Sequence, residues 1–164
     1  MLVLLRHGKS AYPGGVPDHD RPLAERGRRQ AALAGEHIRT HADRFDLVLC
    51  STSVRTRQTL AATGIPSGTL EFRDEIYAAE PDDVLDLIRT VPDEVTSVLV
   101  VGHSPGLPDL ATVLAGPGSA AEGVRLLDEK FPTSAFAVLD VTGPWSGLPD
   151  GSRLVTVTVP RDHP

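Results

Sequence analysis

Apolar residues along the chain gather in short, uninterrupted runs. Three of these runs are each bounded by polar or small residues, and they cover 2–5, 47–50 and 98–101. A continuous apolar run of this length predicts a strand that is buried on both faces. We therefore expect a central sheet with further layers packed against both of its sides.

Segments with the apolar spacing of helices lie between the predicted strands. The spacing is helical from about Arg28, and the acids that open the segment 81–88 stand where a helix dipole favours them. Further helices are predicted over 53–62, after Ser and Thr cap candidates, and from Pro105 to Leu114. Strands that alternate with helices predict an α/β layered fold.

The last part of the chain follows a different pattern. Two strand candidates, 135–141 and 153–159, are joined by a Gly- and Pro-rich link that is too short for a crossover helix. We expect them to pair as a hairpin and to place at least one antiparallel strand in the sheet. Gly and Pro predict loops at 12–22 and 116–123, neither of which is long enough to link two domains, so residues 1–164 are predicted to form one domain.

Composition and charge narrow the class of protein. Apolar residues make up 40% and charged residues 23%, as in soluble globular domains, and the formal net charge of −6 argues against a nucleic-acid or anionic-membrane partner. No apolar run approaches the roughly 18 residues that span a bilayer. The single cysteine, Cys50, continues an apolar run and cannot form an internal disulfide. We therefore expect a cytoplasmic protein in which Cys50 is a core thiol.

Three polar segments share one position, directly after an apolar run. They are Arg6-His7-Gly8, Ser51-Thr-Ser-Val-Arg55 and Gly102-His103-Ser104. In open α/β sheets, the carboxyl ends of the strands form the binding crevice. Arg6, His7, Arg55 and His103 are therefore expected to converge in one place.

Two arginines and two histidines in one crevice favour a tetrahedral oxyanion. Arginine forks match phosphate oxygens, and helices that begin near Ser53 and Pro105 would direct their dipoles at the same place. Neighbouring cations disfavour a charged His7, and a neutral imidazole nitrogen can attack phosphorus. The same cations can stabilise the transferring phosphoryl group, so this chemistry requires no metal or organic cofactor.

A metal site is the competing interpretation of the histidines. Arg6 would repel a cation beside His7, and the three segments contain no nearby carboxylate or cysteine ligand. His37 and His41 stand four apart on a predicted helix but lack the Glu of a zinc-protease signature. We therefore predict no metal, and we interpret this pair as part of a solvated helix face.

The order of the three segments resembles the histidine phosphatase superfamily. The matching motifs are Arg6-His7-Gly8, Ser51-x-x-x-Arg55-Thr56-x-Gln58-Thr59 and Gly102-His103. Arg21-Pro22-Leu23-x-x-x-Gly27, Ile76-Tyr77-x-Ala79 and the segment from Val100 to Leu107 are similar to the short SixA-type phosphohistidine phosphatases. The resemblance covers nearly the whole chain. It implies a three-layer α/β/α sandwich with a mostly parallel mixed central sheet, as in phosphoglycerate mutase-like proteins.

The resemblance also implies a role for each residue. His7 is the expected nucleophile that becomes phosphorylated, Arg6, Arg55 and His103 bind the phosphoryl group, and water then hydrolyses the phosphohistidine. Ser104, where many relatives carry Asn, is a further candidate for phosphate binding. An acid must protonate the leaving group, and Glu75 is the first choice, with Asp74, Asp18 and Asp20 as alternatives.

The substrate is predicted only as a class. No long insertion is available to cover the crevice, which suggests a pocket open to protein phosphohistidine or to small phosphomonoesters. A sugar-phosphate or other small-molecule phosphatase is the alternative within the enzyme class, and a phosphoglycerate mutase is less favoured because the chain has little room for that group's substrate-enclosing insertions. A non-catalytic phosphate-binding or interaction module would use the same side chains.

Overall fold

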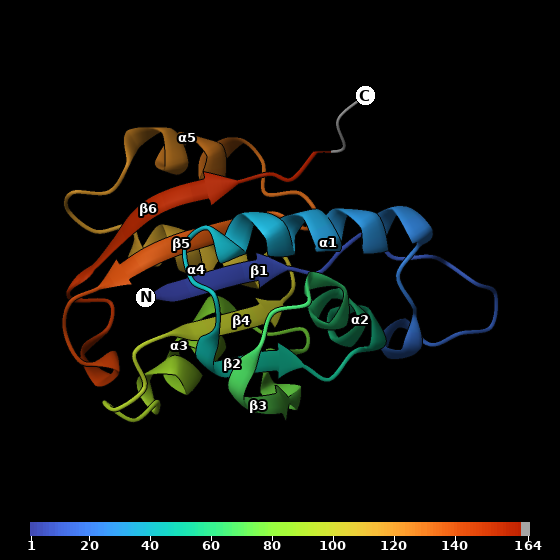
Figure 1. Cartoon of the computed structure of the whole chain (residues 1–164), viewed down its shortest axis with the longest axis horizontal. Helices are drawn as coiled ribbons and strands as arrows, with labels where there is room; N and C mark the ends of the chain where they lie inside the picture. Colours follow the sequence, from blue (N-terminus) through green and yellow to red (C-terminus); the bar gives the residue numbers. More distant parts are fainter. Residues whose placement is uncertain (162–164) are drawn as a thin grey trace.

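The protein forms a six-stranded sheet between two layers of helices (Figure 1). The computed structural model describes residues 1–161, so residues 162–164 of the predicted domain lie outside the described part. The strand order is β3-β2-β4-β1-β5-β6, in which β3, β2, β4 and β1 are parallel to one another and β5 is antiparallel to both β1 and β6. The strands are β1 (Leu2–Arg6), β2 (Phe45–Ser51), β3 (Ser67–Arg73), β4 (Val98–Gly102), β5 (Phe136–Val141) and β6 (Ser152–Thr158).

The helices divide between the two faces of the sheet. On one face lie α1 (Glu25–Arg39) and α2 (Val54–Thr63), and on the other lie α3 (Pro81–Arg89), α4 (Gly106–Leu114) and α5 (Ala121–Glu129). Short 3₁₀ turns occupy Asp18–Asp20, Asp74–Ile76 and Trp145–Gly147. The predicted three-layer α/β/α sandwich with a mostly parallel mixed sheet is confirmed.

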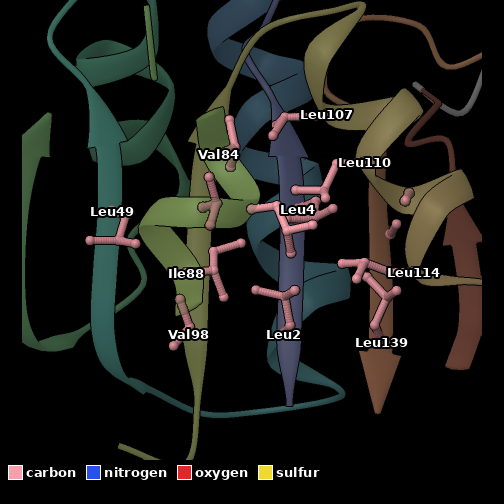
Figure 2. Close-up of a cluster of buried hydrophobic side chains, with 14 of the residues drawn as sticks. Leu2, Leu4, Leu49, Val84, Ile88, Val98, Leu107, Leu110, Leu114 and Leu139 are labelled. Atoms are coloured by element: carbon pink, nitrogen blue, oxygen red, sulfur yellow. The ribbon is translucent and has the colours of Figure 1, made fainter. Parts of the chain in front are cut away.

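Successive residues of the central strands point into two separate cores. Leu2 and Leu4 of β1 pack with α3 and α4, as Figure 2 shows, whereas Val3 and Leu5 pack on the face covered by α1. All four side chains are fully buried. A strand that is covered on both faces must be apolar at every position, which is why the sequence predicts β1, β2 and β4 so directly.

Two elements differ from the prediction. The sequence predicts no strand at the position of the edge strand β3, which carries polar residues and lacks the apolar run of a central strand. Its Leu70 and Phe72 are 42% and 40% exposed. Helix α5 begins at Ala121, so the predicted loop over 116–123 is wrong for its last three residues. A Cβ atom at Gly123 would lie 2.9 Å from Leu154 Cδ2, so the glycine that suggests a loop instead allows close packing of α5 on β6.

The remaining predicted elements are confirmed with small shifts of their ends. Strands β5 and β6 form the expected antiparallel hairpin, and the predicted loop over 12–22 contains the short 3₁₀ turn Asp18–Asp20. Within residues 1–161, no helix has the length and the apolar character that crossing a membrane requires.

Candidate active site

The carboxyl ends of β1, β4 and β2 lie at the same edge of the sheet, where their arrows point in Figure 1. Arg6 ends β1, His103 follows β4, and Arg55 stands in the first turn of α2 just after β2. The His7 backbone N–H donates to the Gly102 carbonyl over 2.9 Å and joins two of these strand ends. His7, Arg55, His103 and Ser104 line one cavity of about 360 Å³.

The His7 ring is fixed by its own backbone. Its Nδ1 lies 2.7 Å from the Gly8 carbonyl oxygen, and because a carbonyl only accepts hydrogen bonds, Nδ1 carries the hydrogen. Burial, with a smaller contribution from the nearby charges of Arg55 and Arg6, lowers the pKa of His7 to about 4, although the hydrogen bond to the Gly8 carbonyl opposes the shift. The ring is therefore neutral at pH 7, with a lone pair on Nε2.

The turn that carries His7 is held by buried contacts. The Gly8 N–H donates to Thr59 Oγ1 over 2.9 Å, and the Thr59 hydroxyl donates to the Arg55 carbonyl over 2.7 Å. Close approach of α1 completes this packing, because a Cβ atom at Gly27 would lie only 2.1 Å from the Lys9 carbonyl oxygen. The nucleophile candidate and Arg55 are thus coupled through a single threonine.

Arg6 is held in place on one side only. Its Nη1 donates to the Phe131 carbonyl over 2.9 Å, while its Nε is buried with no hydrogen-bond partner among the described residues. Arg6 is not among the residues that line the cavity of His7 and His103, although its positive charge contributes to the lowered pKa of both histidines. An incoming oxyanion could therefore satisfy a guanidinium that the fold leaves partly unpaired.

His103 stands beside His7, with 5.3 Å between the ring centroids. Its Nε2 lies 2.8 Å from Ser51 Oγ, at the end of β2. Burial, the nearby His7 ring, which would also gain a proton in acid, and the charge of Arg55 together lower the pKa of His103 to about 3. Both histidines of the site are therefore neutral at pH 7 in the unliganded protein.

Arg55 is occupied by an aspartate. Its guanidinium donates to the Asp18 carbonyl over 2.8 Å and to the Asp18 carboxylate over 3.1 Å. The Tyr77 hydroxyl donates to the same carboxylate over 2.5 Å, and Arg21 donates over 2.9 Å. The Tyr77 hydrogen bond, together with Arg55 and Arg21, holds the pKa of Asp18 at about 2, so a carboxylate rests against the arginine that is expected to bind phosphate.

Within residues 1–161, no group of three His, Cys, Asp or Glu side chains gathers closely enough to hold a metal ion. His37 is exposed on α1, and His41 faces Phe136 with 6.5 Å between the ring centroids. This pair therefore has no further ligand beside it.

The comparison with known proteins follows the same motifs. The family model of the histidine phosphatase superfamily (branch 1) matches residues 2–76. A structure from Nakamurella multipartitia, described as a candidate phosphohistidine phosphatase SixA, is 41% identical, with a TM-score of 0.86 over 97% of this chain and 95% of that chain. The chain belongs to the histidine phosphatase superfamily, in its SixA-type branch.

Two further relatives of this histidine phosphatase cover almost its whole length. The structure of the protein histidine phosphatase SixA complexed with tungstate is 25% identical, with a TM-score of 0.77 over 97% of this chain and 96% of that chain. An uncharacterized protein of Mycobacterium tuberculosis (strain H37Rv) is 49% identical over 159 residues, which are 96% of this chain and 100% of that protein.

Glu75, the first choice for the acid, does not line the cavity that contains His7. The Glu75 carboxylate pairs with Arg73 at 3.2 Å and, together with Asp74, lines an adjoining hollow of about 340 Å³ that shares residues 77–79 with the cavity of His7. The 3₁₀ turn after β3 places Ile76 in the core, where it is 1% exposed, and leaves Glu75 on the outside. The geometry therefore does not support the first choice of acid.

Among the sequence-derived alternatives, Asp18 is the carboxylate that lines the cavity. Asp20 stands beside His19 instead, with 3.4 Å between Oδ1 and Nδ1. Tyr77 and Glu80, to which the sequence assigned no role, also line the cavity. The Tyr77 ring meets the rings of His19 and His103 edge-on, at centroid distances of 4.8 and 5.5 Å. Tyr77 belongs to the SixA-like motif Ile76-Tyr77-x-Ala79, and this motif was the feature of the sequence that could have indicated a role for Tyr77.

Proposed function

We propose that this protein is a metal-independent phosphatase that hydrolyses protein phosphohistidine or phosphomonoesters through a phosphohistidine intermediate on His7. The observation that carries the proposal is the contact between His7 Nδ1 and the Gly8 carbonyl. That contact leaves the Nε2 lone pair as the free nucleophile of a neutral ring, beside Arg55 and His103.

In the first step, the Nε2 lone pair attacks phosphorus. A nitrogen–phosphorus bond forms, the bond from phosphorus to the leaving group breaks, and the electron pair of that bond departs with the leaving group. Arg6, Arg55, His103 and Ser104 are the proposed contacts of the non-bridging oxygens. Arginine and imidazole N–H groups that are already in place stabilise the charge on these oxygens without rearrangement.

We assign proton transfer to Asp18 in place of Glu75. In the unliganded protein its carboxylate is ionised and rests on Arg55. A phosphoryl group bound to Arg55 would share that cation and add negative charge next to Asp18, which raises the pKa of the carboxyl group. Asp18 can then carry the proton that the leaving group needs.

In the second step, water attacks the phosphorus of phosphohistidine, and the ionised Asp18 accepts the proton that the water releases. A phosphorus–oxygen bond forms, the nitrogen–phosphorus bond breaks, and its electron pair returns to His7 Nε2. Inorganic phosphate leaves, Asp18 releases its proton to water as its pKa falls again, and Arg55 regains its contact with the carboxylate. The cycle therefore needs no group other than water and the side chains of this chain.

The substrate class and the location rest on two further supports. The SixA relatives are described as phosphohistidine phosphatases, and one is complexed with tungstate, which is a tetrahedral oxyanion like phosphate. A cytoplasmic location agrees with the single cysteine, Cys50, which is free and buried. We propose protein phosphohistidine as the first substrate to test.

Hydrolysis of an aryl phosphate, measured with and without a chelator, tests the reaction. We expect release of phosphate that is insensitive to the chelator and that is abolished by His7→Ala. His41→Ala is the matched control, since it removes an imidazole from the end of α1, and it should retain full activity. Tight binding of phosphate without turnover would instead support a non-catalytic binding module.

The catalytic efficiencies for a phosphohistidine protein and for sugar phosphates then test the substrate class. We expect kcat/KM to be higher for the phosphohistidine protein. A higher value for a sugar phosphate would favour the alternative of a small-molecule phosphatase.

A further inference from the structure

Ser51 contacts the site from inside the protein. It ends β2, has no exposed surface, and does not line the cavity of His7 and His103. Its hydroxyl oxygen lies 2.8 Å from His103 Nε2. This contact occupies one ring nitrogen of His103, so Nδ1 is the nitrogen left to meet a phosphoryl oxygen.

A neutral imidazole carries a hydrogen on only one of its two nitrogens. If Nε2 of His103 held it, the ring would donate to Ser51 and would present a lone pair on Nδ1 to the oxyanion, which is repulsive. If Nδ1 holds it, the Ser51 hydroxyl donates to Nε2 and the Nδ1–H can donate to the phosphoryl group. Only the second arrangement makes a neutral His103 a useful phosphate contact.

Among the described residues, His103 Nε2 is the acceptor that the Ser51 hydroxyl can reach, which favours the second arrangement. The Ser53 backbone N–H points at Ser51 Oγ over 3.4 Å, so this oxygen already faces one donor. A hydroxyl oxygen that accepts one hydrogen bond can still direct its own hydrogen at Nε2 of His103. In the unliganded protein, burial first and the neighbouring charges second lower the pKa of His103 to about 3, so its ring is not doubly protonated at neutral pH and only one nitrogen carries a hydrogen.

We propose that Ser51 is a positioning residue that fixes His103 as the Nδ1–H tautomer, so that the neutral ring donates a hydrogen bond to the transferring phosphoryl group. The catalytic consequence rests on the proposed function, whereas the tautomer does not. At metal sites, a hydrogen-bond partner on the second ring nitrogen of a ligating histidine fixes its tautomer. Loss of that partner lowers metal affinity or activity by about 10- to 100-fold.

His7 and His103 would then both be Nδ1–H tautomers, but each would use a different ring nitrogen toward the phosphoryl group. His7 donates its Nδ1–H to the Gly8 carbonyl and keeps the Nε2 lone pair for phosphorus. His103 accepts from Ser51 at Nε2 and keeps Nδ1–H for a phosphoryl oxygen. One ring thus supplies an electron pair and the other supplies a hydrogen-bond donor, although both are uncharged.

A ¹⁵N NMR spectrum of the histidine rings in the wild-type protein, recorded at neutral pH without ligand, tests the tautomer. We expect a protonated Nδ1 and an unprotonated Nε2 for His103, assigned with the help of His103→Gln. A hydrogen on Nε2 of His103 would overturn the proposal. The tautomer itself is read from the wild-type protein, and His103→Gln serves only to assign its signals.

Variants of Ser51 test the consequence for binding and turnover, with tungstate as the oxyanion probe. Ser51→Ala should move the hydrogen of His103 toward Nε2 and should weaken tungstate binding and kcat by about 10- to 100-fold. Ser51→Thr keeps the hydroxyl and should restore the wild-type tautomer and most of the activity. An unchanged tautomer and unchanged tungstate affinity in Ser51→Ala would overturn the proposal.

Ser152→Ala is the matched control for the loss of a buried hydroxyl. Ser152 is buried at the start of β6, and its hydroxyl bonds to the carbonyls of Leu114 and Pro149. Its removal should lower stability but leave the His103 spectrum unchanged. If His103 carries Nδ1–H but no phosphoester is hydrolysed, this inference stands and the proposed function fails. If turnover proceeds through His7 while His103 carries Nε2–H, the reverse holds.

Discussion

The cavity has two sides that are built in different ways. On the sheet side, His7 and Arg55 are buried and are tied together by the hydrogen bonds of Gly8 and Thr59. On the loop side, the Asp18 side chain is 54% exposed and is held by hydrogen bonds from Arg55 and Tyr77. Buried packing and hydrogen bonds hold the sheet side, whereas side chains that line the cavity hold Asp18 on the loop side.

This difference separates two tasks of the site. Side chains that the core holds need no rearrangement when an oxyanion arrives, so they suit the binding of charge that is present throughout the reaction. A carboxylate that is held by Arg55 loses part of its support when a phosphoryl group takes the same arginine. In the proposed mechanism, the loop side is therefore the part whose protonation responds to the substrate.

The largest effect is expected from the sheet side. Arg55→Ala should lower kcat/KM for an aryl phosphate by about 10²- to 10³-fold, as for the loss of other fixed donors to a transition state. Arg57→Ala is the control from the same helix, because Arg57 is exposed and stacks 4.0 Å from the ring centroid of Phe72. A change of less than tenfold for Arg55→Ala would remove it from the phosphate site.

The loop side should respond according to the leaving group. Asp18→Asn should slow an alkyl phosphate about 10²-fold and an activated aryl phosphate far less, since only the poor leaving group needs a proton. Glu75→Gln is the control, because that carboxylate pairs with Arg73 outside the cavity. Equal slowing of both substrates by Asp18→Asn would show that Asp18 only orients Arg55.

The fixed side should also make the fold sensitive to acid. The pKa of His7 falls to about 4 and that of His103 to about 3, while both take a value near 6.5 in the unfolded chain. Below pH 6.5 the unfolded chain therefore binds protons that the native state refuses, so stability is full above this pH and falls as the pH decreases toward 4.

Urea unfolding at pH 7.5 and pH 4.5 measures this acid sensitivity. The free energy of unfolding should be lower at pH 4.5 than at pH 7.5, by on the order of 1–3 kcal/mol for each of the two histidines. His7→Gln should reduce the difference. A stability that is equal at the two values would contradict two buried neutral histidines.

The smallest effect is expected at Cys50, directly before Ser51 in β2. Its side chain is fully buried, as predicted, and burial raises the pKa of its thiol to about 12. A thiol-alkylating reagent should therefore leave both the native thiol and the phosphatase activity unchanged. Rapid inactivation that Cys50→Ala prevents would show that the sheet side opens to solvent.

The parts of the site that the sequence predicts are those that depend on strand ends. Buried parallel strands must be apolar throughout, so β1, β2 and β4 are visible as runs, and the residue after each run is placed at a known edge of the sheet. This geometry is sufficient to predict that His7, Arg55 and His103 meet. It requires no knowledge of the loops.

The parts that escaped prediction depend on side-chain contacts across loops or on exposed elements. Asp18 was one of the predicted alternatives for the acid, but its contact with Arg55 depends on the path of the loop after β1. Glu75 is turned outward because Ile76 enters the core. The edge strand β3 is half covered and has no apolar run. Ser51 lies in a quoted motif, but its contact with His103 depends on the alignment of β2 with β4.

Capture of the phosphorylated enzyme tests the central claim most directly. The protein is mixed with an aryl phosphate, quenched within milliseconds to seconds in alkali, in which phosphohistidine is stable, and digested for mass spectrometry. We predict one phosphate on Nε2 of His7 in the wild-type protein and none in His7→Ala. Steady turnover with no phosphate on His7, or with phosphate on another residue, would contradict the account.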